Sequence, residues 1–190
     1  YAVGRDQHGV FIARYTAAGE RSWSQPLHGL DAGPPPALAV DAAGTVYVAG
    51  GFADRLRVGA TTLAGSARKD VFVLHLDARG EVVSAARYGG SWFETARAIA
   101  VDRAGDVYVA GTYQRELDLH GAVIHNGVEN DVFVAKFDAR GAHRWNTRLA
   151  DRGCLDARGN ALALGPDGDV YVAGLACRRV TFEGEPAPDR

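Results

Sequence analysis

The stretch ALAVDAAGTVYVAG occupies residues 37–50, and close copies of it occupy residues 98–111 and 161–174. The copies begin 61 and then 63 residues apart. Self-similarity at a fixed period of this length is typical of repeat architectures, in which each copy is one structural unit. The sequence therefore predicts a chain built from about three similar units.

A second line of text follows the first within each period. It reads DVFVLHLDARG at residues 70–80, returns as DVFVAKFDARG at residues 131–141, and appears in weaker form as GVFIARYTAAG at residues 9–19. Both lines alternate apolar and polar residues, which is the pattern of β-strands, and both contain a D-x-x-G turn whose glycine allows a positive φ.

The middle period predicts four short strands and one excursion between the second and the third. The strands are expected at 98–101, 106–112, 131–138 and 143–149, and the excursion at 116–125. Four short antiparallel strands per period describe one blade of a β-propeller. The fold class is therefore predicted as all-β, with propeller blades. The alternative is a β-solenoid, whose coils are usually shorter, at roughly 20 to 30 residues.

The first strand of each unit is expected to lie innermost, because only small side chains fit where blades converge. Its small residues are Ala37, Ala39, Ala98, Ala100, Ala161 and Ala163. The fourth strand carries Trp23 and Trp145 at matching positions, with Ser84 between them, and is expected to lie outermost.

The unit boundaries predict a half-blade at 1–36, blades at 37–97 and 98–160, and a half-blade at 161–190. Residues 1–6 align with residues 62–67 at the 61-residue offset, so the chain is expected to begin inside an excursion.

Three units are too few to close a ring, because known propellers have about four to eight blades. An open arc is expected, with unpaired edges at Val10–Leu27 and Ala161–Leu175 that neighbouring repeats of a longer chain or a head-to-tail six-bladed dimer would cover.

Composition excludes some classes of partner. The chain has 21 basic and 23 acidic residues, interspersed, and a formal net charge of −2. No block of like charge suggests nucleic-acid binding, and no apolar run is long enough for this segment to insert into a membrane.

These lines resemble the bacterial seven-bladed β-propeller (SBBP) repeat, found in exported proteins of myxobacteria and related groups. The likeness rests on the two repeated lines and on the excursion Leu-Asp-Leu-His-Gly at 117–121, with relatives at 56–59 and 180–184. The resemblance implies a secreted, lipid-anchored or cell-surface protein, and it implies little about chemistry.

One loop departs from the repeat, at Ser91-Trp92-Phe93-Glu94. It joins the fourth strand of one blade to the first strand of the next. Trp92 and Phe93 with Glu94 form the candidate ligand site, because adjacent aromatics beside an acid suit a sugar or a peptide. The alternative is that these side chains plug the gap between blades.

Polar residues inside the repeated lines are interpreted as structural. The turn aspartates Asp41, Asp77, Asp102, Asp138 and Asp167 are expected to accept hydrogen bonds from their own turns rather than to bind calcium. The basic series Arg14, His75 and Lys136 is expected to extend out of the wedge between blades, pairing with Asp77 or Asp138. The six histidines show no zinc spacing, and the sequence predicts no metal, no cofactor and no catalytic residue.

Cys154 and Cys177 are the only cysteines, and they flank the open end of the predicted 161–173 hairpin. A disulfide between them is predicted, and it would accord with an oxidising compartment. Two free thiols are the alternative.

These observations favour a non-enzymatic extracytoplasmic binding or scaffold module, with an unknown protein or glycan partner. A lectin-like propeller that uses Trp92 and Phe93 is the alternative. A fragment of a propeller lyase or glycosidase, with its catalytic residues in other blades, is a second alternative.

Overall fold

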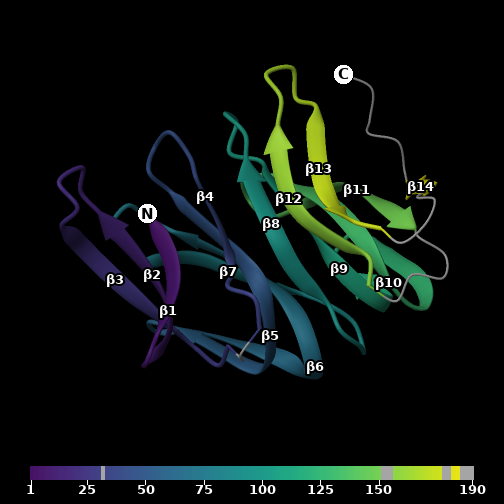
Figure 1. Cartoon of the computed structure of the whole chain (residues 1–190), viewed down its shortest axis with the longest axis horizontal. Coiled ribbons are helices and arrows are strands. Elements are labelled where there is room, and N and C mark those ends of the chain that lie inside the picture. Colours follow the sequence, from purple (N-terminus) through teal and green to yellow (C-terminus); the bar gives the residue numbers. More distant parts are fainter. Residues whose placement is uncertain (31–32, 151–155, 177–180, 185–190) are drawn as a thin grey trace.

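The computed structural model describes residues 1–30, 33–150, 156–176 and 181–184. The described chain is all-β, with two larger antiparallel sheets and a two-stranded hairpin that follow one another along the molecule (Figure 1). In that part of the chain no helix is long and apolar enough to span a membrane. The all-β prediction is confirmed.

Fourteen strands make up the sheets of the described residues. They are β1 (Ala2–Asp6), β2 (Gly9–Tyr15), β3 (Arg21–His28), β4 (Ala37–Val40), β5 (Val46–Val58), β6 (Thr61–Leu76), β7 (Val82–Tyr88), β8 (Thr95–Val101), β9 (Val107–Asp118), β10 (Val123–Phe137), β11 (His143–Ala150), β12 (Arg158–Leu164), β13 (Val170–Leu175) and β14 (Thr181–Gly184).

The strands follow the sequence period. β4 to β7 and β8 to β11 each form a meander of four antiparallel strands, and β12 and β13 are the first two strands of a third unit. The D-x-x-G turns close the hairpins, with Gly44 and Gly80 at φ +84° and +87°. Positive φ suits glycine because it lacks a Cβ.

Adjacent units pack face to face. β4 and β5 contact β8, and β12 contacts β8 and β9, so the small-residue first strands lie next to one another. A core cluster joins both complete blades, including Tyr47 and Val73 from one and Ile99 and Phe133 from the other. Each fully buried aliphatic or aromatic side chain contributes about 1.5–3 kcal/mol. The units are arranged as in an open part of a propeller.

The excursion is an extension of the hairpin between the second and third strands, and it also joins neighbouring units. Its outer end pairs antiparallel with the last residues of the preceding fourth strand. The three equivalent pairs are His28 with Arg57, Gly89 with Asp118, and Ala150 with Thr181. Backbone pairing therefore links neighbouring units edge to edge, in addition to side-chain packing.

The alignment of residues 1–6 with an excursion is wrong. β1 pairs with β2 in the register of a second strand, because Gly4 faces Phe11 as Gly50 faces Phe72. A Cβ on either glycine would lie within 3 Å of that phenylalanine ring, so the same close contact recurs. The first unit thus contains a second, a third and a fourth strand, namely β1, β2 and β3. No excursion separates β1 from β2.

The arc does not close at three units. β2 pairs with β1 and β3, and β13 pairs with β12 in the described residues. The expectation of a free edge at Val10–Leu27 is wrong, because β1 pairs with the inner side of β2. The edge strand of this sheet is β1. β1 occupies the second-strand place that β13 also fills in its own unit, so the two ends are not complementary halves of one blade. The predicted Cys154–Cys177 disulfide lies outside the described residues.

Candidate functional site

The loop at 91–94 is tied to the preceding blade through its backbone. The Lys69 N–H donates to the Trp92 carbonyl at 3.3 Å, and the Glu94 N–H donates to the Lys69 carbonyl at 2.7 Å. These bonds form a short parallel bridge beside β6. The loop is therefore held in place between β7 and β8, where the sequence placed it.

Two guanidinium groups lie against the Trp92 indole. The Cζ atoms of Arg68 and Arg115 are 4.4 and 4.0 Å from the ring centroid. Such cation–π contacts stabilise by about 0.5–1 kcal/mol each at exposed sites. Phe93 also meets Arg68, at 5.1 Å, but 46% of its surface remains exposed. Trp92 is engaged within the protein, and Phe93 is the aromatic left open to a partner.

Glu94 points into the interior and is fully buried. Its Oε2 accepts a hydrogen bond from the Gly90 N–H at 3.1 Å, and its Oε1 accepts none from the described residues. Burial raises the pKa of Glu94 to about 7, and the charges of Asp70 and Glu116 act in the same direction. A buried carboxyl of this kind favours its neutral form.

Asp70 is a second fully buried acid close to this loop. It accepts hydrogen bonds from the Ser66 N–H and from the Arg87 guanidinium, the latter at 3.2 Å. The pair recurs one period later as Asp131 and Arg148, at 3.5 Å. In the first unit both partners are missing together, because the equivalent positions are Gly9 and Pro26. The covarying pair indicates a structural link between the third and fourth strands.

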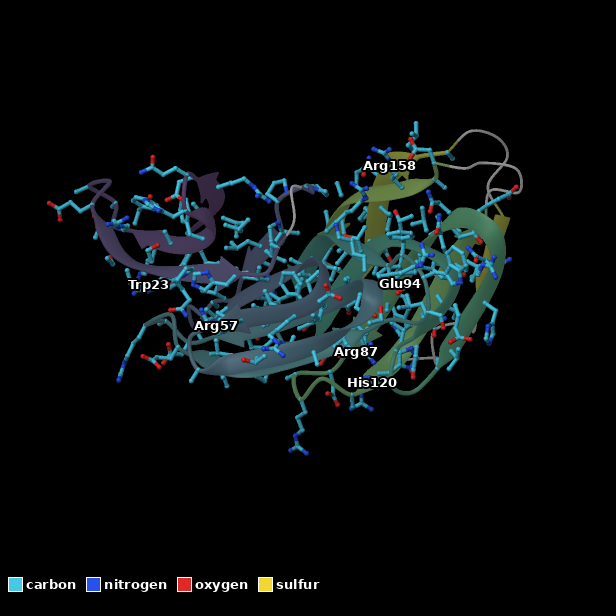
Figure 2. All side chains as sticks on the ribbon, turned by 90° about the horizontal axis from the view of Figure 1, so that it is seen from below. Trp23, Arg57, Arg87, Glu94, His120 and Arg158 are labelled. Carbon is cyan, nitrogen blue, oxygen red and sulfur yellow. The ribbon has the colours of Figure 1, made fainter. Side chains whose placement is uncertain are left out.

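The structure thus places the three predicted site residues in three different settings. Trp92 lies against arginines, Phe93 lies on the surface, and Glu94, labelled in Figure 2, lies in the core. Sequence reasoning missed Arg68, Arg115 and Asp70. The repeated Asp–Arg pair was visible in the sequence, whereas the two arginines stand outside the repeated lines and gave no signal.

The structural interpretation of the turn aspartates is confirmed at four of the five. One oxygen of each accepts two N–H groups of its own turn, as Asp41 does from Ala43 and Thr45 at 2.9 and 2.8 Å. The same pattern holds at Asp77, Asp102 and Asp138. Over the described ranges, no three His, Cys, Asp or Glu side chains come together in a way that could hold a metal ion.

The basic series has partners other than those expected. Lys136 pairs with Asp106 at 2.8 Å and with Asp102 at 3.7 Å, whereas Asp138 pairs with Arg144 at 2.8 Å. Each basic residue also meets the tyrosine of the second strand in its own unit. The pairs are Arg14 with Tyr1, His75 with Tyr47, and Lys136 with Tyr108. His75 and Lys136 thus lie against the second-strand tyrosines, whereas Arg14 is exposed and donates to the Ala78 carbonyl of the next unit at 3.2 Å.

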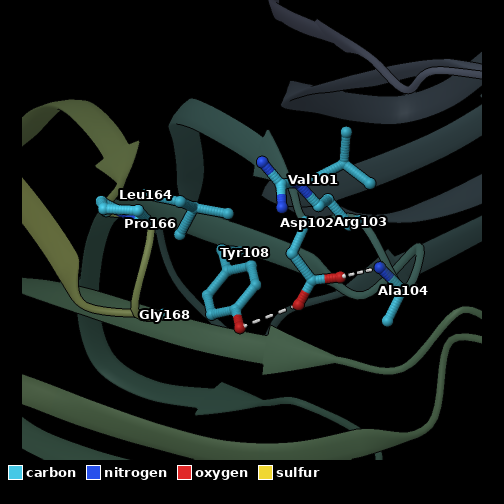
Figure 3. Close-up of a pocket in the computed structure, with 9 residues that line it drawn as sticks. Val101, Asp102, Arg103, Ala104, Tyr108, Leu164, Pro166 and Gly168 are labelled. Carbon is cyan, nitrogen blue, oxygen red and sulfur yellow. Dashed lines mark hydrogen bonds between the residues drawn. The ribbon is translucent and has the colours of Figure 1, made fainter.

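A cavity of about 440 Å³ separates the first turn of the second complete blade from the equivalent turn of the third unit (Figure 3). Asp102 and Tyr108 line one side, and Leu164 and Pro166 line the other. The Tyr108 hydroxyl donates to Asp102 at 3.2 Å, and the other Asp102 oxygen accepts the turn N–H groups. Both Asp102 oxygens and the Tyr108 hydroxyl therefore already have partners within the protein.

Comparison with known proteins adds no identification. No protein-family model matches the sequence, and a search of curated proteins found no match.

Proposed function

We propose that this chain is a non-enzymatic binding or structural scaffold module of the seven-bladed β-propeller repeat type, working outside the cytoplasm. The observation that carries the proposal is the repeated edge-to-edge link between units. It recurs at His28–Arg57, Gly89–Asp118 and Ala150–Thr181 with the same antiparallel geometry. Such links suit a module whose task is to present a continuous surface along many units.

The use of the charged side chains supports the same function. The Asp70–Arg87 and Asp131–Arg148 pairs join strands, and the turn aspartates cap their own turns. Glu94, whose pKa burial raises to about 7, lines neither the cavity beside Asp102 nor a second cavity beside Ser84. A catalytic acid must reach substrate, so its position supports a role in the core.

Location and activity can be tested together in cells that produce the full-length protein. External protease should remove this segment from intact cells, and the purified chain should leave polysaccharides unchanged after long incubation. Retention of the segment inside protease-treated cells, or turnover of a polysaccharide by the chain, would overturn the proposal.

The lectin-like alternative has one observation in its favour, the 46% exposure of Phe93. Its test is a glycan array with wild type, Phe93→Ala and Trp92→Ala. Loss of a glycan signal in Phe93→Ala would support a sugar-binding surface. No signal in wild type, or an unchanged signal in Phe93→Ala, would remove this alternative.

A further inference from the structure

The indole of Trp23 fills the space between the first unit and the first complete blade. Trp23, on β3, donates its Nε1–H to the Ala78 carbonyl at 3.0 Å. A Cβ on Gly80 would lie 2.9 Å from atoms of the Trp23 ring, so the indole lies directly on this glycine. Figure 2 labels Trp23 in the N-terminal sheet.

One period later the indole is replaced by a hydroxymethyl group. Ser84 pairs with His75 across the strands as Trp23 pairs with Arg14, so the two positions are equivalent. The counterpart of Gly80 is Gly141, where a Cβ would meet nothing within 4 Å. The place that an indole fills in the first contact is therefore open in the second.

A cavity of about 160 Å³ occupies this place, and Ser84, His75 and Gly141 border it. For comparison, a buried apolar cavity of about 150 Å³ binds benzene. The volume suits one planar aromatic group, with the open side leaving room for a larger ring system.

One wall of the cavity is aromatic, and Asp138 and Arg140 add charged groups at its border. Tyr88 and Phe137 stack with their centroids 4.6 Å apart, and His120 lies 5.1 Å from Tyr88. Burial raises the pKa of Tyr88 to about 12 and lowers the pKa of His75, so both rings are neutral at pH 7. Aromatic rings of this kind prefer offset or edge-to-face contact with another ring.

We propose that this cavity binds a planar aromatic group of the indole type. The ring lies on Gly141, and its N–H points to the carbonyl of Ala139, the counterpart of Ala78. The group comes either from a free indole-like molecule or from a tryptophan side chain of a partner. The proposal rests on the proposed function, since it names a ligand for the binding module.

Two probes test the site and distinguish its sources. Fluorinated indole, followed by fluorine NMR, and N-acetyltryptophan amide, followed by calorimetry, are titrated into the wild-type chain. Saturable binding of either probe is expected. Binding of indole alone indicates a free small molecule, and binding of both indicates that a peptide-borne side chain also fits.

Substitutions at Ser84 locate the binding. Ser84→Trp should restore the indole found in the other units and weaken binding of the probes at least about tenfold, because the stacking and burial are then lost. Ser84→Phe is a smaller blocking variant, should Ser84→Trp fail to fold by circular dichroism. Ser84→Ala removes only the hydroxyl and should bind within about twofold of wild type.

A gain of binding gives an independent check. Trp23→Ser should open the equivalent place over Gly80 and raise the number of bound indoles from one to two per chain. No saturable binding to folded wild type, or binding that both blocking variants leave unchanged, would overturn the site. Neither result bears on the scaffold function, because that function is tested separately by protease treatment of intact cells and by polysaccharide turnover.

Discussion

Substitution of Glu94 by Gln should remove the loss of stability that the Glu94 carboxyl causes between pH 4.5 and 7. The Glu94 side chain is fully buried, and its pKa rises from 4.5 to about 7. In this interval the folded protein binds more protons than the unfolded chain, so the free energy of unfolding decreases as pH rises. A difference of this size corresponds to about 3 kcal/mol, lost in full above pH 7.

The assay is urea unfolding at several pH values between 4.5 and 8, followed by tryptophan fluorescence. Glu94→Gln resembles the neutral carboxyl, so wild type should fall below it by up to about 3 kcal/mol at pH 8 and match it near pH 4.5. His75 has a lowered pKa from burial, which makes stability increase with pH up to about 6.5. That contribution is common to both proteins and cancels in their difference.

Glu81→Gln is the matched control, because this glutamate is exposed at a turn. It should follow the wild-type pH profile. Parallel profiles for wild type and Glu94→Gln would refute the reasoning, since they would mean that the Glu94 carboxyl is ionised in the folded core without penalty.

Four further substitutions, one of them a control, test other contacts by urea unfolding. Trp23→Phe keeps a ring over the neighbouring turn but loses the 3.0 Å bond from Nε1, and should cost about 1 kcal/mol; no loss would mean that this bond adds nothing. Gly111→Ala places a Cβ 2.1 Å from the Thr95 carbonyl oxygen and should cost about 3 kcal/mol, whereas Gly127→Ala, with nothing within 4 Å, should change stability by less than about 0.5 kcal/mol. Equal effects at the two glycines would contradict this close packing. Asp70→Ala leaves an arginine and a partly buried N–H without their acceptor and should cost about 2–3 kcal/mol, and a neutral effect would show that the pair is dispensable.

Strands and turns could be predicted because they depend on the local amino-acid sequence. Alternation within 98–101 and 131–138 and the D-x-x-G turns determine where the chain extends and reverses. A constant offset of 61 misplaces residues 1–6, because the first unit has no excursion between β1 and β2. The resemblance of Tyr1-Ala2-Val3-Gly4 to Tyr47-Val48-Ala49-Gly50 was the signal for a second strand.

The candidate site depends on contacts between units, which the local pattern does not encode. Glu94 stands in a loop that the sequence gives no reason to bury, and only the packing of β6 and the Gly90 N–H around it shows that it is buried. The repeat shows that Ser84 stands where other units have tryptophan. The cavity that results could not be predicted, because it depends on where Gly141 of the next blade lies. Arg68 and Arg115 likewise meet Trp92 from two different units.

Amide hydrogen exchange at Gly89 and Asp118 tests the central claim, that the excursion of each blade is hydrogen-bonded to the fourth strand of the blade before it. Each N–H of this pair donates to the carbonyl of the other, at 3.2 and 3.4 Å. Both amides should therefore exchange as slowly as amides within β9 and β10, since opening them requires the blades to separate. Exchange as fast as that of the exposed turn amides would show that neighbouring blades are not joined at this edge.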